Sequence, residues 1–115
     1  MVRIVDPTKL EGNVISNDNA HQLNYKAVFP PSTSARLLCN WVSIGVGGTS
    51  RKHKHDWEQV NYIISGEGLL FVNDDSSLNV KQGMIIHLPS EVMHWFENTS
   101  DADFIILGVL GPDAQ

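Results

Sequence analysis

The apolar residues from position 36 onward occur in short runs that are separated by glycine, proline and small polar residues. No segment carries a helical apolar repeat longer than about two turns. The runs recur at roughly the 8 to 12 residue spacing that is typical of a β-sandwich or barrel, so we predict an all-β fold. The expected strands of this region are residues 37–46, 60–64, 69–72, 78–80, 84–88, 94–97 and 103–109.

The first 35 residues have a different pattern, with little clean periodicity and three prolines. One strand is expected there, over residues 23–29, where polar and aromatic side chains mix as they would in an exposed or interface strand. The adjacent Pro30 and Pro31 end this segment. We predict a single domain in which residues 1–35 form an extended N-terminal arm and residues 36–115 form the barrel.

Charge and composition exclude several classes of function. The 115 residues carry a formal net charge of -5, which argues against a nucleic-acid-binding surface and against an anionic membrane surface. The longest apolar runs, such as residues 104–107, are far below the ~18 residues that span a bilayer, and the N-terminus lacks the apolar core of a signal peptide. We expect a cytoplasmic protein. Cys39 is the single cysteine, which excludes an internal disulfide and a zinc-thiolate cluster.

The candidate metal ligands are concentrated between His53 and Gln59. Side chains on an extended strand alternate between its two faces, so His53 and His55 are expected to point to the same face as a chelating pair. His94 is distant in the sequence, and only a folded sheet would bring it beside them. We predict one mononuclear metal site.

Two glycine-bounded stretches contain these histidines. The first reads Gly47, five residues, His53-x-His55, three residues, Gln59, six residues and Gly66. The second reads Gly83, five residues, Pro89, and later His94, three residues and Asn98. In order and spacing the two stretches resemble the two motifs of the cupin superfamily. The resemblance covers residues 47–98 in detail and implies the cupin double-stranded β-helix, a jelly-roll barrel.

The resemblance implies four metal ligands, with water or substrate at the remaining positions: His53, His55, Gln59 and His94. Two positions depart from the family pattern. Gln59 stands where cupins most often have a glutamate, and the neighbouring Glu58 is expected to point to the opposite face. Glu91 stands where the second motif is expected to have a glycine, which alters the turn before His94.

This ligand set has consequences for the metal. Three neutral imidazoles and a neutral amide leave the charge of a divalent ion uncompensated, whereas a glutamate would cancel one unit. The metal is therefore expected to be a stronger Lewis acid and to hold anionic oxygen ligands more tightly. Imidazole-rich sets suit several divalent transition metals, and iron, manganese, nickel, copper and zinc all stay open as the cofactor.

Asn61 and His87 are candidate catalytic residues, and strand parity supports only the first of them. Asn61 is expected to share the inward face of Gln59 and to hydrogen-bond a substrate, although a polar residue on a wet face is an equal alternative. Because Pro89 interrupts the strand pattern, the sequence does not show whether the side chain of His87 points into the barrel or outward. His87 is a candidate acid or base near the metal, but a hydrogen-bonded strand histidine is the preferred interpretation.

The resemblance leaves the activity open, because one fold hosts many functions. The Trp57-Glu58 step is similar to that of the manganese or iron cupins related to quercetin dioxygenases, which implies a dioxygenase-like oxidoreductase acting on a small oxygenated molecule. The same stretch also resembles the pectin-degradation cupins, which implies an isomerase or lyase on a sugar-derived acid. Those cupins place an Asp, a Phe and an Arg on or just after the last strand, a pattern that residues 107–113 do not reproduce.

Two non-enzymatic alternatives also stay open. A small-ligand-binding cupin needs the same pocket but no acid or base, and an empty scaffold is the least favoured alternative because the ligand set is intact. For assembly, cupins of this size commonly pair through an outer sheet face and an N-terminal strand. The expected strand with Tyr25 and Phe29 suits such a contact, so we predict a homodimer that binds a small molecule.

Overall fold

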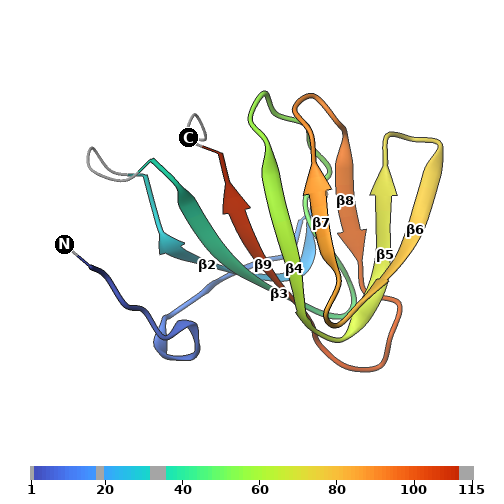
Figure 1. Ribbon diagram of the computed structural model, residues 1–115. Coiled ribbons are helices and arrows are strands. Elements are labelled where there is room, and N and C mark those ends of the chain that lie inside the picture. The colour runs from blue at the N-terminus through green and yellow to red at the C-terminus, as the bar shows by residue number, and fades with distance from the viewer. Residues whose placement is uncertain (1, 18–19, 32–35, 112–115) are drawn as a thin grey trace.

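The computed structural model describes residues 2–17, 20–31 and 36–111 (Figure 1). Within these ranges nine strands form one curled sheet, and a 3-10 turn, η1 (Pro7–Lys9), precedes them. The strands are β1 (Asn13–Ile15), β2 (His21–Phe29), β3 (Leu38–Thr49), β4 (Gln59–Ser65), β5 (Glu67–Val72), β6 (Ser76–Lys81), β7 (Ile85–Leu88), β8 (His94–Glu97) and β9 (Phe104–Leu110). The predicted all-β class is confirmed.

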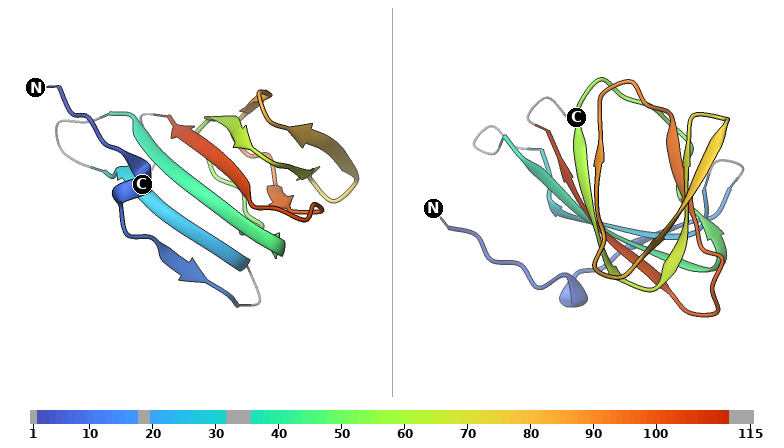
Figure 2. Two further views of the ribbon diagram at one scale, coloured as in Figure 1. Left: turned by 90° about the horizontal axis from the view of Figure 1, so that it is seen from below. Right: turned by 45° about the vertical axis from the view of Figure 1, so that its right-hand side comes forward.

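Hydrogen bonding joins the strands in the order β6-β5-β8-β3-β9-β4-β7, while β2 pairs with β3 and β1 pairs with β2. All of these pairs are antiparallel. The sheet curls so that β4 and β7 stand opposite β8, β5 and β6 (Figure 2). This curling encloses an interior toward which one face of each central strand points.

The eight strands expected from the hydrophobic pattern are all present, with bounds within three residues of the predicted ones. One expectation is wrong, because His53 and His55 lie in the connection between β3 and β4 rather than on a strand. The short β1 was not predicted, since its Asn-Val-Ile sequence is too brief to show alternation.

Alternation along the central strands builds the core. Ile44 on β3, Ile63 on β4 and Phe104 on β9 have no exposed surface. Because side chains on a strand alternate with period two, each of these strands places every second residue in the interior.

The parity expected for β4 is confirmed. Gln59, Asn61 and Ile63 are buried, whereas Val60 and Tyr62 between them are exposed. The buried face of β4 therefore carries two amide side chains into the interior.

The N-terminal segment is built into the sheet. β2 pairs with β3 along its whole length, and Ala20 and Leu23 belong to the core cluster. The predicted domain boundary at residue 35 lies outside the described residues, as do residues 112–115 at the end of the predicted barrel. In the part of the chain that the structure describes, no helix is long and apolar enough to cross a membrane.

Asn98 fixes the connection between β8 and β9. Its side-chain amide donates to the carbonyl oxygens of Ile44 (2.9 Å) and Ala102 (2.7 Å). Its Oδ1 accepts hydrogen bonds from the backbone N–H (2.9 Å) and the hydroxyl (2.8 Å) of Ser100. All four hydrogen-bonding positions of this buried amide are used, so the asparagine of the second motif has a structural role.

Two turns show why the motifs favour glycine. Gly66, between β4 and β5, has φ +84, and a Cβ there would clash with the carbonyl oxygen of Asp103. Glu91, which replaces the expected glycine of the second motif, has φ +66. A residue with a Cβ is unfavourable in this left-handed region, so this departure introduces local backbone strain.

Candidate metal centre

The two motif segments meet through the backbones of His53 and His94. The N–H of His53 donates to the carbonyl of His94 (3.3 Å), and the N–H of His94 donates to the carbonyl of His53 (3.0 Å). The carbonyl of His55 accepts a hydrogen bond from the N–H of Glu91 at 2.7 Å, which ties the second histidine to the turn before β8. The folded sheet thus brings His94 beside the other two histidines.

The three imidazoles are oriented in the same way, each by a backbone carbonyl two residues away. The Nδ1 atoms of His53, His55 and His94 lie 2.8, 2.8 and 2.9 Å from carbonyl oxygens. A carbonyl oxygen can only accept, so each Nδ1 carries the proton and donates. In the neutral ring this leaves the lone pair on Nε2, which is the atom able to bind a metal.

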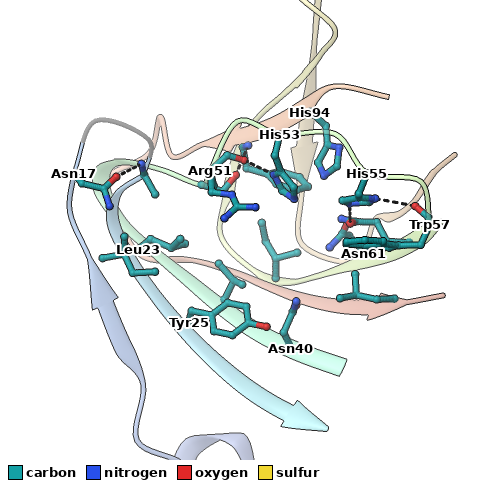
Figure 3. A pocket seen from close by; sticks show the side chains of 18 residues that line it. Asn17, Leu23, Tyr25, Asn40, Arg51, His53, His55, Trp57, Asn61 and His94 are labelled. Atoms are coloured by element: carbon teal, nitrogen blue, oxygen red, sulfur yellow. Dashed lines mark hydrogen bonds between the residues drawn. The ribbon is translucent and has the colours of Figure 1, made fainter. Parts of the chain in front are cut away.

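The free ring nitrogens converge on one point. The ligand atoms of the three histidines lie within 4.8 Å of one another, and their ring centroids are 4.7, 5.1 and 5.1 Å apart (Figure 3). The Nε2 of His94 is buried and has no hydrogen-bond partner among the residues that the structure describes. A buried lone pair without a partner is unfavourable, and a cation would satisfy it. This set of nitrogens fits a divalent transition metal.

Gln59 joins this cluster with its amide oxygen. Its Oε1 lies 2.8 Å from Nε2 of His55, and its Nε2 donates to Oδ1 of Asn61 at 2.8 Å. Because Nδ1 of His55 carries the proton, two lone pairs face each other across the contact between His55 and Gln59. A cation bound by both atoms would make this approach favourable, since two neighbouring ligands at ~2.1 Å from a metal lie roughly 3 Å apart.

Burial keeps the imidazoles of His53 and His94 uncharged. It lowers the pKa of His94 to about 4, against a smaller opposing effect of the hydrogen bond to Val92. Burial also lowers the pKa of His53, and the positive charge of Arg51 acts in the same direction. Both rings are therefore neutral near neutral pH, which is the form that binds a metal.

Trp57 restrains the ring of His55. Its carbonyl accepts the Nδ1 hydrogen bond, and its indole stacks on the imidazole with centroids 4.4 Å apart and planes 4° from parallel. The hydrogen bond limits rotation of the ring and the stacking limits its tilt.

A cavity of about 520 Å³ lies beside the histidines (Figure 3). The three imidazoles, Gln59 and Asn61 line it together with an apolar wall. Members of this wall come from both the N-terminal segment and the barrel, for example Ile15, Leu23, Val42 and Ile106. The segment preceding the motifs therefore helps to shape the cavity.

The two candidate catalytic residues have different positions. Asn61 lines the cavity, where it holds the amide of Gln59. His87 pairs with Val60 across β4 and β7, so it shares the outer face and is exposed, with Nε2 3.6 Å from the carboxylate of Glu58. His87 therefore lies outside the cavity, which removes it as a candidate acid or base next to the metal.

Several cavity residues were missed in the sequence, including polar ones. Arg51, Asn40 and Tyr25 also line the cavity. Tyr25 was expected at an outer interface, and its inward facing depends on the register of β2 against β3, where it pairs with Val42. The proximity of Arg51 to His53 in the sequence was the one available signal for it.

Comparison with known proteins supports the fold. The family model for the cupin domain matches residues 40–110, a span that contains both motif segments and β4 to β9. A search of curated proteins found no significant match.

Several solved structures share this architecture. The polyketide cyclase RemF from Streptomyces resistomycificus superposes with a TM-score of 0.85 at 20% identity, covering 98% of this chain and 81% of that chain. A predicted oxalate decarboxylase from Thermotoga maritima has a TM-score of 0.84 at 22% identity, with coverages of 96% and 99%. KdgF from Halomonas sp. has a TM-score of 0.74 at 15% identity, with coverages of 93% and 92%. At these identities the likeness shows the fold alone.

Proposed function

The chain belongs to the cupin domain family, and from this premise we propose that it is a metal-dependent enzyme with a dioxygenase-like activity on a small oxygenated molecule. The proposal assigns four side chains as ligands of one divalent transition metal: His53, His55, Gln59 and His94. One observation carries it. Three imidazoles with carbonyl-bound Nδ1 atoms converge on one cavity, and the buried Nε2 of His94 is left without a partner.

The residues around the ligands have positioning roles in this proposal. Asn61 accepts the hydrogen bond that turns the oxygen of Gln59 toward His55, and Trp57 holds the ring of His55. Such partners of metal ligands raise affinity by fixing ligand orientation. A bound redox-active ion would supply the Lewis acidity and the electron transfer that an oxygen-consuming reaction needs. The apolar wall would exclude water from the bound substrate.

The lack of carboxylates among the described residues that line the cavity favours this chemistry over an isomerase or lyase. Among the described residues, the cavity lining contains no aspartate or glutamate. Proton transfer to and from a sugar-derived acid needs a positioned acid or base, and carboxylates commonly serve. A non-catalytic ligand-binding cupin needs the same cavity, and it stays the alternative.

The test is elemental analysis of protein purified without chelator or added metal. The wild type is expected to hold near-stoichiometric metal, and the His53→Ala/His55→Ala variant is expected to hold almost none. A His21→Ala/His87→Ala variant is the matched control, because both of these histidines are exposed and lie outside the cavity. It should retain the metal of the wild type.

The metal-loaded protein is then screened with an oxygen electrode against flavonols, catechols and hydroxylated organic acids. Oxygen uptake that requires the metal and the two histidines supports the dioxygenase-like activity. Stoichiometric metal without oxygen uptake would favour the binding alternative. Absence of metal from the wild type, even after reconstitution, would overturn the ligand assignment.

A further inference from the structure

Arg51 is a cation of the cavity that the proposed metal chemistry does not use. It lines the cavity beside His53, where its carbonyl accepts the Nδ1 hydrogen bond of that ring (Figure 3). Its side chain is exposed, so the guanidinium stands at the accessible side of the site. Arg51 can therefore meet a molecule that enters from solvent.

Among the described residues, no acidic group balances this guanidinium. Within residues 2–17, 20–31 and 36–111, Arg51 forms no ion pair, whereas the adjacent Lys52 pairs with Asp74 at 2.6 Å. The described part of the cavity lining also contains no carboxylate. A divalent ion held by neutral ligands would add two further positive charges. The formal charge of the loaded site is therefore +3, in a protein whose formal net charge is -5.

The rest of the cavity is mostly apolar, with neutral polar groups such as Asn40 and Asn61, and is larger than a simple inorganic anion or a two-carbon acid requires. Aromatic and branched side chains form its wall, including Tyr25, Trp57, Phe96, Ile106 and Leu110. A volume of about 520 Å³ is within the range of sites that hold drug-sized organic molecules. A ligand that fits this cavity combines a negatively charged end with an apolar body.

We propose that the site binds an organic acid in which a carboxylate and a neighbouring hydroxyl or carbonyl oxygen are attached to an apolar, ring-sized body. The two oxygen donors bind at the open positions of the metal, and the guanidinium of Arg51 pairs with the carboxylate. Guanidinium-carboxylate pairs are strong and directional, so Arg51 acts as a specificity-determining residue for acids over neutral analogues. This inference rests on the proposed function, because it requires the metal.

The test is calorimetric titration of zinc-loaded protein, whose metal content is measured before and after each titration. The probe is 3-hydroxy-2-naphthoate, which has a carboxylate next to a hydroxyl on two fused rings. Its neutral counterpart 3-hydroxy-2-naphthamide tests whether binding needs the negative charge. Glycolate, which keeps the charge but has no rings, tests whether binding needs the apolar body. The naphthoate is expected to bind at least about tenfold more tightly than either of them.

Two single variants distinguish a direct contact of Arg51 with the ligand from a general effect of the protein's charge on binding. Arg51→Gln is expected to raise the Kd of the naphthoate about tenfold or more, and to leave that of the naphthamide within about twofold. Lys52→Gln removes the same charge one residue along, from a side chain that does not line the cavity. It should change the Kd of the naphthoate by less than about twofold.

The outcomes distinguish this inference from the function on which it rests. Stoichiometric zinc with equal binding of naphthoate and naphthamide, or with no effect of Arg51→Gln, would overturn the inference and leave the metal site intact. Unchanged naphthoate binding by the His53→Ala/His55→Ala protein would also overturn it. Failure of the wild type to load zinc would overturn the metal assignment and this inference together, and the metal analysis reveals it before any probe is added.

Discussion

The two ends of β8 carry polar side chains that are equally buried but differently bonded. His94 begins the strand and is 2% exposed, and Asn98 follows its last residue and is 3% exposed. Every hydrogen-bonding position of the Asn98 amide has a partner within the protein. At His94 the Nδ1 is bonded and the Nε2 is not. Burial alone therefore does not distinguish these two residues, whereas the bonding of their buried atoms does.

The largest expected effect on stability comes from Asn98→Ala. The substitution removes the side-chain bonds to the carbonyls of Ile44 and Ala102 and to the N–H of Ser100, although the Ala102 carbonyl keeps the Ser100 hydroxyl as a donor. Loss of several bonds to buried groups is expected to lower the free energy of unfolding by about 3 kcal/mol. Urea denaturation of the metal-free protein measures this change, and elemental analysis of the folded variant should still find metal.

His94→Ala, at the other end of β8, is expected to have the opposite pattern, with a large loss of metal and a small loss of stability. It removes a proposed ligand, so metal content should fall to near zero. The metal-free protein loses one side-chain bond, to the carbonyl of Val92, and its free energy of unfolding should fall by only about 1 kcal/mol. Equal losses of stability in the two variants, or loss of metal in both, would contradict the distinction between the two ends.

The sequence predicts which residues are important at both ends of β8. The motif spacing identifies His94 and Asn98 as motif residues, and strand alternation predicts the buried face of β4 on which Gln59 and Asn61 lie. These predictions succeed because period-two alternation is a local property of the chain. They do not show which buried atom lacks a partner, because that depends on contacts such as the one from Asn98 to Ile44, distant in the sequence.

The cavity wall was less predictable than the ligands. Arg51 lies in a connection without periodicity, and the facing of Tyr25 depends on how β2 is aligned with β3. The ambiguity at His87 was likewise resolved by pairing between strands, which sets it opposite Val60. Register between distant strands is a tertiary property, so a local pattern leaves it open.

Acidification should lower the free energy of unfolding of the metal-free protein, because the buried His94 resists protonation. The Asn98 amide does not titrate and should contribute nothing to this loss. Burial lowers the pKa of His94 from 6.5 to about 4, and it lowers that of His53 as well. Above the unfolded pKa both states hold neutral rings. As pH falls from about 6.5 toward 4, the unfolded chain binds protons that the folded protein excludes, so stability falls, by at most about 1.4 kcal/mol per pH unit for each group.

Urea denaturation in the presence of chelator, at about pH 7, 6 and 5, measures this dependence. The His94→Ala variant should show a shallower loss than the wild type, because one of the shifted groups is gone. The carboxylates that titrate in the same range are common to both proteins, so the difference between the two curves isolates His94. Parallel curves would show that His94 is not the source of the acid sensitivity.

The smallest expected effect concerns the turn that leads into the His94 end. Glu91 has φ +66 where the family pattern has glycine, and its N–H bonds the carbonyl of His55. Glycine adopts this conformation without steric penalty, so Glu91→Gly is expected to raise the free energy of unfolding by up to about 1 kcal/mol, partly offset by greater freedom of the unfolded chain. Glu91→Ala is the control, since it removes the carboxylate but keeps the Cβ. Thermal or urea denaturation should find stabilisation in the glycine variant alone. Equal stabilisation by alanine would assign the effect to the lost charge, and the strain at this turn would then be negligible.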